Sequence, residues 1–246
     1  MIRSRRGLVV IAAATFVIGV VALFPARVAY QWFAPPGVAI SNISGTVWSG
    51  SAGEATINQL YLHDLQWRFR PSSLFSGGLG FHLEAKPVSG FVDAVVIAGF
   101  GNSVEVHDLT ASMPLEVLGS ALRIGGLRGS ASLQFERLEM SDQTLRYAAG
   151  TLNVANVSVP LVGRELLGGY RAEFSTQSDV INASVEDTDD VVDLAGTLTI
   201  RPDRSYDLEG LIIATPTTPN TIRQQMEFLG PANDRGQREI RFGGTY

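Results

Sequence analysis

Apolar and polar residues follow two different patterns along this chain of 246 residues. Residues 7–24 form one apolar run without a charge, whereas from residue 38 onward apolar and polar residues alternate in short segments. A long uncharged run is typical of a membrane-spanning helix, and alternation with a period of two is typical of a strand with one buried face. The pattern therefore predicts an N-terminal helix followed by a β-rich domain.

Glycine, proline and other turn residues divide the alternating part into about ten candidate strands. Residues 60–69 alternate well, except for a slip of one residue at His63 and Asp64. A slip of this kind predicts a β-bulge or a turn. The tripeptide His-Asp-Leu recurs at residues 107–109, which suggests copies of one β unit. Together these segments predict an all-β fold with a single curved or partly closed, mainly antiparallel sheet.

Two segments depart from the strand pattern and predict helices. Residues 114–122 predict a short helix. Residues 218–231 predict a stronger one, with Thr218 as its N-cap and Pro219 at its first helical position. One face of this C-terminal helix is apolar and should lie on the sheet: it carries Ile222, Met226 and Leu229. Residues 237–246 then predict a closing strand.

The uncharged run of residues 7–24 predicts a transmembrane helix. It would be about 27 Å long at about 1.5 Å per residue, close to the thickness of the hydrocarbon core of a bilayer. Arg3, Arg5 and Arg6 precede it, and Pro25 ends it. Basic residues on this side hold the N-terminus in the cytoplasm. A cleaved signal peptide is the alternative, although its apolar region is usually only about 7–15 residues long.

The chain divides into four parts on this interpretation. Residues 1–6 form a cytoplasmic N-terminus, 7–24 the anchor, 25–37 a linker and 38–246 an exported β domain. In a Gram-negative bacterium the anchor would lie in the inner membrane and the β domain in the periplasm.

Composition excludes several classes of protein. The chain has no cysteine, so disulfides and thiolate metal sites are ruled out. Its net charge is −5, and residues 25–246 hold 16 basic against 24 acidic residues. A domain with this negative balance has no broad basic surface for nucleic acids.

The histidines and the acidic run do not have the spacing of a metal site. The two residues of each His-Asp pair, at 63–64 and 107–108, would point to opposite faces of a strand, and His82 lies in a different segment. The acidic run at residues 186–190, with Asp193 beyond it, lacks the glycine and glutamate of an EF-hand loop. It predicts a hairpin tip instead, and we expect no metal.

Two glycine-rich segments do not have the surroundings of a catalytic or phosphate-binding loop. Ser-Gly-Ser-Ala-Gly at residues 49–53 lacks the strand, turn and helix of a nucleophile elbow. Gly-Gly-Leu-Gly at residues 77–80 is not followed by a helix. We therefore expect a protein that is not an enzyme and has no cofactor.

Four motifs in a fixed order resemble protein N of the bacterial type II (general) secretion pathway. They are Gly-Thr-Val-Trp-Ser-Gly at 45–50, Leu-Gln-Trp-Arg-Phe-Arg-Pro at 65–71, Leu-Thr-Ile-Arg-Pro at 198–202, and Leu-Gly at 229–230 with the arginine-rich C-terminal strand. The resemblance covers nearly the whole chain. It implies a non-catalytic protein of the inner membrane with one transmembrane helix and a periplasmic β domain. It also implies that the protein contacts other subunits of the machine that exports folded proteins across the outer membrane.

The first two motifs contain six residues that we expect to be structural or to contact a partner: Gly45, Thr46, Trp48, Gly50, Trp67 and Arg70. The two glycines would permit sharp bends on either side of the Trp48 ring. This ring would cover the end of an apolar sheet face, with Trp67 on the same face. Core packing and partner contact both remain open for Trp48.

A second function fits the same sequence. An anchored, curved sheet with an apolar concave face could shield the acyl chains of lipids between two membranes. Apolar strands such as Val-Val-Ile-Ala-Gly-Phe at residues 95–100 suit this lipid-handling function, and they suit an ordinary protein core equally well.

Overall fold

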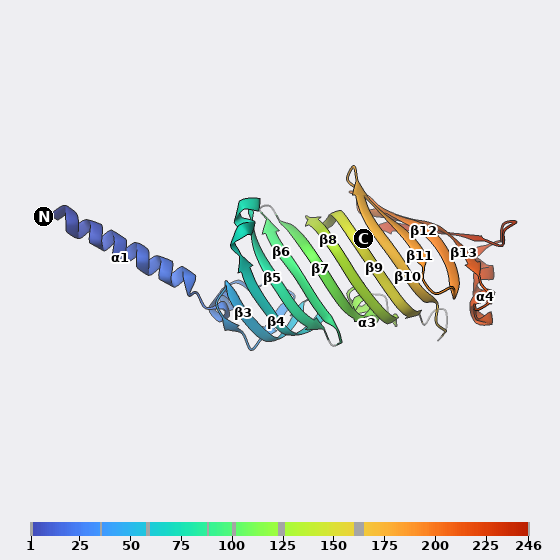
Figure 1. Ribbon diagram of the computed structural model, residues 1–246, viewed down its shortest axis with the longest axis horizontal. Helices are drawn as coiled ribbons and strands as arrows, with labels where there is room; N and C mark the ends of the chain where they lie inside the picture. The colour runs from blue at the N-terminus through green and yellow to red at the C-terminus, as the bar shows by residue number, and fades with distance from the viewer. Residues whose placement is uncertain are drawn as a thin grey trace.

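One large open β-sheet forms the body of the protein, and helix α1 projects from one end of it (Figure 1). The computed structural model describes residues 2–34, 36–57, 60–87, 89–99, 102–122, 126–159 and 165–245. The helices are α1 (Ile2–Ala22), α2 (Ala26–Phe33), α3 (Leu115–Leu122) and α4 (Asn220–Met226), with the 3-10 helices η1 (Pro71–Ser76) and η3 (Glu227–Leu229). The strands are β1 (Val38–Ser41), β2 (Ser44–Gly45), β3 (Ser49–Ile57), β4 (Leu60–Arg70), β5 (Gly78–Pro87), β6 (Phe91–Gly99), β7 (Ser103–Pro114), β8 (Arg128–Ser141), β9 (Thr144–Ser158), β10 (Gly168–Gln177), β11 (Val180–Asp187), β12 (Val192–Ile200), β13 (Ser205–Ala214) and β14 (Arg238–Thr245).

The strands follow one another through the sheet in chain order. Among the described residues, the sheet has 14 strands in the order β1-β3-β4 and so on to β14, with β2 paired to β3. Neighbouring strands run antiparallel, as in β7 and β8 or β12 and β13. In this order β1 and β14 stand at opposite ends, so the sheet is not closed. The prediction of a curved, mainly antiparallel sheet is confirmed, and its partly closed form is wrong.

The sheet has two unlike faces. A row of mutually paired positions crosses ten strands and contains no charged residue: Ala85, Val92, Ala111, Leu133, Leu152, Ala172, Val185, Gly196, Gly210 and Ile240. Their neighbours along the strands point the other way and include exposed residues such as Gln134 and Glu173. We call the apolar side the inner face and the polar side the outer face.

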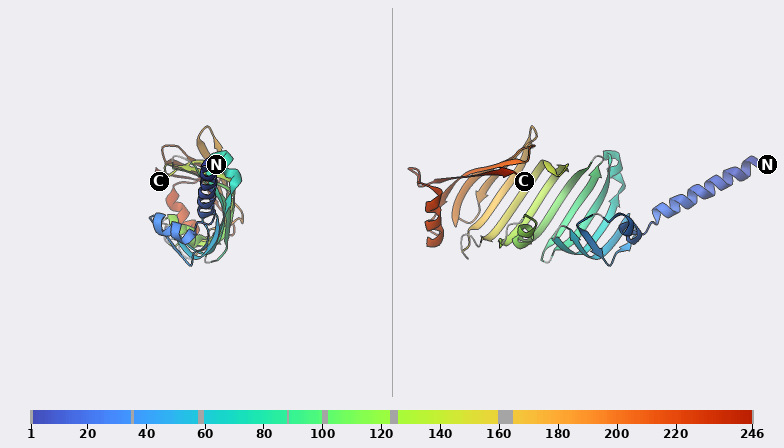
Figure 2. Two further views of the ribbon diagram at one scale, coloured as in Figure 1. Left: turned by 90° about the vertical axis from the view of Figure 1, so that its left-hand side faces the viewer. Right: turned by 180° about the vertical axis from the view of Figure 1, so that it is seen from behind.

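Helices α3 and α4 pack on the inner face. Leu115 of α3 contacts Ala131, and Ile222 of α4 contacts Val192. Seen end-on, the sheet curves around the side on which these helices lie, so the inner face is concave (Figure 2). Since the apolar residues cannot be covered by a second sheet, curvature and short helices provide their burial.

This burial is incomplete. Among the described side chains, Ile181 and Val192 are the largest that are less than 2% exposed. Inner-face residues such as Val106 and Leu133 are only half-buried. The protein therefore has a one-sided core with apolar surface left partly open.

Both His-Asp-Leu tripeptides form β-bulges. In β4, Asp64 and Leu65 stand opposite one residue of β5, and in β7 Asp108 lies where the register with β6 shifts. The φ angles of Asp64 and Asp108 are 50° and 52°, in the left-handed region that aspartate adopts more readily than most residues. Bulges bend their strands. The bulge predicted at His63 and Asp64 is confirmed, and the repeat reflects two bends of the sheet.

The sequence prediction missed several N-terminal elements. Residues 25–37, expected to be a linker, contain α2, and residues 38–57 contain β1, β2 and β3. Strand β3 consists mainly of serine, glycine and alanine, so it lacks the large alternating side chains that reveal a strand. The described ranges consequently contain 14 strands where about ten were predicted.

The two predicted helices are present, and the C-terminal one differs in detail. Pro219, not Thr218, occupies the N-cap position of α4. The Thr218 hydroxyl instead donates a hydrogen bond to the Val191 carbonyl (2.6 Å). Ile222 and Met226 are buried on the sheet as expected, whereas Leu229 is 39% exposed because the chain has already changed to η3.

Helix α1 contains many apolar side chains that the rest of the chain does not cover. The exposed ones are Leu8, Val9, Val10, Ile11, Phe16, Val17, Ile18, Val20 and Val21. Within the ranges that the structure describes, no helix combines the length and the apolarity needed to cross a membrane. The transmembrane part of the sequence prediction is thus not confirmed.

Candidate functional site

The end of α1 is tied to the sheet by the loop that contains Trp48. The indole Nε1–H of Trp48 donates a hydrogen bond to the Val21 carbonyl (2.7 Å), and the Val47 amide donates to the Phe24 carbonyl (3.0 Å). The Val21 carbonyl at the end of α1 also accepts a hydrogen bond from the Phe24 amide (3.3 Å), so the indole adds a second donor to it. We call residues 44–50 with the end of α1 the junction.

Thr46 holds this loop in shape. Its hydroxyl oxygen accepts hydrogen bonds from the amides of Trp48 (3.3 Å) and Ser49 (3.2 Å). Its carbonyl accepts one from the indole Nε1–H of Trp67 (3.0 Å). Gly45, just before it, has a φ of 88°, which favours glycine. The bend predicted at Gly45 is therefore present.

Gly50 has a different role from the one expected. A Cβ atom at this position would lie 2.4 Å from Cζ2 of Trp67 and 2.4 Å from the Ser44 carbonyl oxygen. Gly50 lies opposite Trp67 in register within β3, so it allows the ring to lie directly over the strand. Close approach of the Trp67 ring is what requires glycine at this position, and the sharp bend expected at Gly50 stays a prediction.

The junction joins the apolar surface of α1 to the inner face. The Trp48 and Phe69 rings lie 4.9 Å apart between centroids, and the Phe69 and Phe81 rings 5.5 Å apart. A hollow of about 460 Å³ lies between the helix and these rings, lined by Val17, Ile18, Val21, Ala22, Trp48 and Phe69. Trp48 is half-buried. Its proposed contact with a partner stays a prediction.

Arg70 lies apart from the other five predicted residues. It pairs with Gly80 at the end of β4, on the outer face, and its carbonyl accepts a hydrogen bond from the Ser73 hydroxyl (2.5 Å). The structure therefore brings together Gly45, Thr46, Trp48, Gly50 and Trp67 but not Arg70.

A continuous row of apolar side chains leads away from the junction across the inner face. Its paired positions, one each on β4 to β9, are Phe69, Phe81, Val96, Val106, Leu138 and Ala148. We call these six residues the apolar row. The row one position away, on the outer face, contains Arg68, His82, His107 and Arg137. The register thus separates an uncharged track from a charged surface.

Among the residues that the structure describes, one group on the outer face has metal-ligand geometry that the sequence did not reveal. One ligand atom each of His82, Glu84 and Asp93 lie within 4.8 Å of one another. Asp93 comes from the next strand, so only the β5–β6 register could have identified it. His82 Nε2 is already hydrogen-bonded to Asp93 Oδ2 at 3.0 Å, which is the geometry of an ion pair. All three side chains are at least 30% exposed.

The other polar candidates have structural surroundings. His107 lies 3.0 Å from Glu105, whose carboxylate also faces Arg137. Ser51 lies within β3 beside Ser44, not at a turn between a strand and a helix. The acidic run at 186–190 covers the end of β11 and the predicted hairpin tip, where the Asp187 carboxylate accepts a hydrogen bond from the Asp190 amide (3.2 Å). These contacts fix turns and strands.

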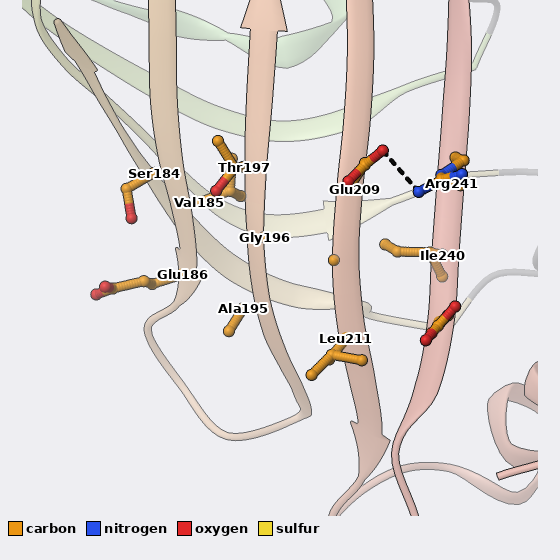
Figure 3. Close-up of a pocket in the computed structure, with 12 residues that line it drawn as sticks. Ser184, Val185, Glu186, Ala195, Gly196, Thr197, Glu209, Leu211, Ile240 and Arg241 are labelled. Atoms are coloured by element: carbon orange, nitrogen blue, oxygen red, sulfur yellow. Dashed lines mark ion pairs between the residues drawn. The ribbon is translucent and has the colours of Figure 1, made fainter. Parts of the chain in front are cut away.

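The far end of the sheet contains a polar hollow of about 500 Å³ (Figure 3). Residues of β11, β12, β13 and β14 line it, and Glu209 and Arg241 form an ion pair of 2.8 Å across its edge. Gly196 and Gly210, which pair with each other in register, are among the lining residues. The hollow is open and has a charged pair that is already satisfied.

Among the described residues of the inner face, Tyr170 is the titratable group whose pKa is shifted most clearly by its environment. Burial, and then the charges of Asp189 and Asp187, raise the pKa of Tyr170 from 10.0 to about 12. Its hydroxyl donates a hydrogen bond to the Leu167 carbonyl (2.7 Å). The phenol is consequently held neutral against the apolar surface around Val157.

Comparison with known proteins identifies similar chains. The family model of type II secretion system (T2SS) protein N matches residues 36–241. Type II secretion system protein N of Pectobacterium carotovorum subsp. carotovorum is 24% identical over 225 residues, which cover 89% of each chain. The protein of the same name from Aeromonas hydrophila is 22% identical over 218 residues, covering 85% of this chain and 86% of the relative. That of Vibrio cholerae serotype O1 is 23% identical over 232 residues, with 89% of each chain covered. No solved structure matches.

The close approach at Gly50 predicts a specific steric effect. Gly50→Ala should lower the free energy of unfolding by about 1–3 kcal/mol, because the new methyl group overlaps the Trp67 ring and a backbone oxygen. Gly53→Ala, in the same strand, is the control: its Cβ would meet the side chain of Asn42 at 3.2 Å, and this exposed side chain can move. Denaturant unfolding of the two variants measures the difference. Equal stability of the two variants would contradict the assigned role.

The raised pKa of Tyr170 predicts a loss of stability at high pH. The folded state keeps its phenol protonated up to about pH 12, whereas the unfolded state loses the proton near pH 10, so the free energy of unfolding falls between these values. At neutral pH, Tyr170→Phe should be less stable by about 1 kcal/mol through loss of the hydrogen bond to Leu167. The difference in the free energy of unfolding between the unmodified protein and Tyr170→Phe should narrow from pH 10 to 12, because only the unmodified protein has the phenol. A constant gap in unfolding experiments would show that the phenol titrates normally.

Proposed function

The chain belongs to the family of type II secretion system protein N, and from this premise we propose that it is a non-catalytic component of a type II secretion system that acts by binding other subunits. The observation that carries the proposal is the extent of the family match, which runs from before β1 into β14. By binding these subunits, the protein would support the export of folded proteins across the outer membrane.

Exposed groups at the C-terminal end of the sheet support a binding role. Strand β14 ends the strand order, so the backbone groups along the edge that points away from β13 have no neighbouring strand among the described residues. Such an edge is a natural place for another chain to add a strand. Phe242 on β14 is 56% exposed, and Phe228 in η3 is 90% exposed. Large exposed aromatic side chains are frequent anchors of protein interfaces.

Attachment to the inner membrane through α1 is part of the proposal. The support is the uncharged run of residues 7–24, in which Thr15 is the only polar side chain, and the exposure of the apolar residues along α1. A helix that is apolar on all sides has no face suited to water. Arg3, Arg5 and Arg6 favour a cytoplasmic N-terminus, which would place the β domain in the periplasm.

The arrangement of polar groups supports a non-catalytic role. His82 and His107 are held by neighbouring carboxylates on the outer face, in contact with solvent. General acid–base catalysis needs such groups to converge on a substrate-sized site. The apolar hollow at the junction contains only carbon-rich side chains and the indole N–H that is bonded to Val21.

The contact role predicts that surface aromatics at the C-terminal end affect secretion without affecting folding. In a strain that lacks the chromosomal gene, Phe228→Asp and Phe242→Asp should reduce release of an extracellular hydrolase by about tenfold, the effect of about 1.4 kcal/mol of lost binding. Their melting temperatures should stay unchanged because both side chains are exposed. The control is Phe75→Asp, which alters a ring in η1 that is 95% exposed.

In-cell photocrosslinking from positions 228 and 242 identifies the partner directly. Another secretion subunit should be recovered from both positions and not from position 75. Normal secretion by both aspartate variants, with no secretion subunit crosslinked, would contradict the contact role.

The membrane orientation predicts the behaviour of a C-terminal reporter. Alkaline phosphatase fused after residue 246 should be active, because it folds only after export. Deletion of residues 7–24 should abolish this activity and release the chain from the membrane fraction. An active fusion that no longer needs residues 7–24, or a reporter that works only in the cytoplasm, would disprove the orientation.

A further inference from the structure

The apolar row begins at the junction, where the inner face meets the end of α1. Trp48 contacts both the end of the helix and Phe69, the first residue of the row. From there the row runs across the sheet in the direction of its long axis (Figure 1). Five of its six side chains are half-buried, and only Ala148 is fully buried. A ligand can therefore follow one uncharged path from α1 onto the concave face.

The chemistry of the row excludes ligands that need polar partners. Every strand from β4 to β9 has a paired neighbour on each side, so the backbone N–H and C=O groups beneath the row are engaged in the sheet. A peptide lying across them would bury its own backbone groups without hydrogen bonds, which is unfavourable. A lipid headgroup would meet no opposite charge on the row. A hydrocarbon chain has neither difficulty.

The dimensions suit a hydrocarbon chain. The distance between neighbouring strands is about 4.8 Å, so the six strands of the row extend about 24 Å. One leaflet of a bilayer is about 15 Å of hydrocarbon. The row is longer than one leaflet is thick, so a single acyl chain can lie on the row along the entire length of the acyl chain.

We propose that the apolar row binds an acyl chain of a membrane phospholipid, which reaches it over Trp48 at the junction. The lipid leaves one leaflet beside α1 and lies in the concave face with its headgroup in water. This inference rests on the proposed attachment of α1 to the membrane. It gives the curved sheet a ligand in addition to its partners in secretion.

The test uses the full chain reconstituted in vesicles of phosphatidylethanolamine and phosphatidylglycerol. A small fraction of the lipid carries a photoreactive diazirine near the end of an acyl chain. After illumination, mass spectrometry locates the labelled residues. Label is expected on α1 and on inner-face residues of β4 to β9, and not on the outer face.

A matched pair of substitutions in β7 tests the row itself. Val106→Asp places a charge on the row and should reduce labelling of β4 to β9 by about tenfold, since an ionised carboxylate is poorly accommodated beside hydrocarbon. Thr110→Asp, exposed on the outer face of the same strand, should leave labelling unchanged. Val104→Asp, on the inner face and 39% exposed, replaces the first variant if that variant does not fold.

The outcomes separate this inference from the proposed function. Label confined to α1 would overturn the lipid site and leave the membrane attachment intact. Absence of label from the whole chain would overturn both the attachment and the lipid site. A protein segment crosslinked along the row in cells, in place of lipid, would also overturn the inference. The secretion role is tested separately, by whether deletion of the gene abolishes secretion, and that result does not depend on any of the three labelling or crosslinking outcomes.

Discussion

The structure depends on one constraint: a single antiparallel sheet has an apolar face, and in the part of the chain that the structure describes no second sheet covers it. The chain meets this constraint by curving the sheet and by placing α3 and α4 on the concave side. The Asp64 and Asp108 bulges add bends where the register shifts. What remains is a half-buried apolar surface on the inner face of the sheet. Charged residues lie on the outer face, where they form ion pairs with one another.

The junction connects one end of this apolar surface to helix α1. Trp48 satisfies a carbonyl at the end of α1 and packs on Phe69, so the helix and the inner face share one apolar region. Gly50 leaves room for the Trp67 ring to approach strand β3 closely. Among the described residues, β14 is an edge strand at one end of the sheet, and α1 projects from the other end. In the two proposals made above, secretion and lipid binding use different parts of one molecule.

Much of this architecture could be predicted from the sequence, because large residues alternate clearly in strands such as β4 and β10. The bulge at His63 and Asp64 was visible as a slip in that alternation. Strand β3 was missed because its serine, glycine and alanine side chains carry almost no pattern. The clustering around Trp48 was expected only in outline, since its partner Val21 is 27 residues away and depends on how α1 ends. The grouping of His82 with Asp93 required the register of two strands.

The most direct test of the account is the accessibility of β10 to thiol reagents. The chain has no cysteine, so single cysteines at 171–175 can be placed without background. The account predicts that positions 171, 173 and 175 react with both a neutral and a cationic reagent. Positions 172 and 174 should react with the neutral reagent and only slowly with the cationic one. Protection of 172 and 174 from both reagents would reveal a second covering layer, and equal reactivity of all five would show that the two faces are not distinct.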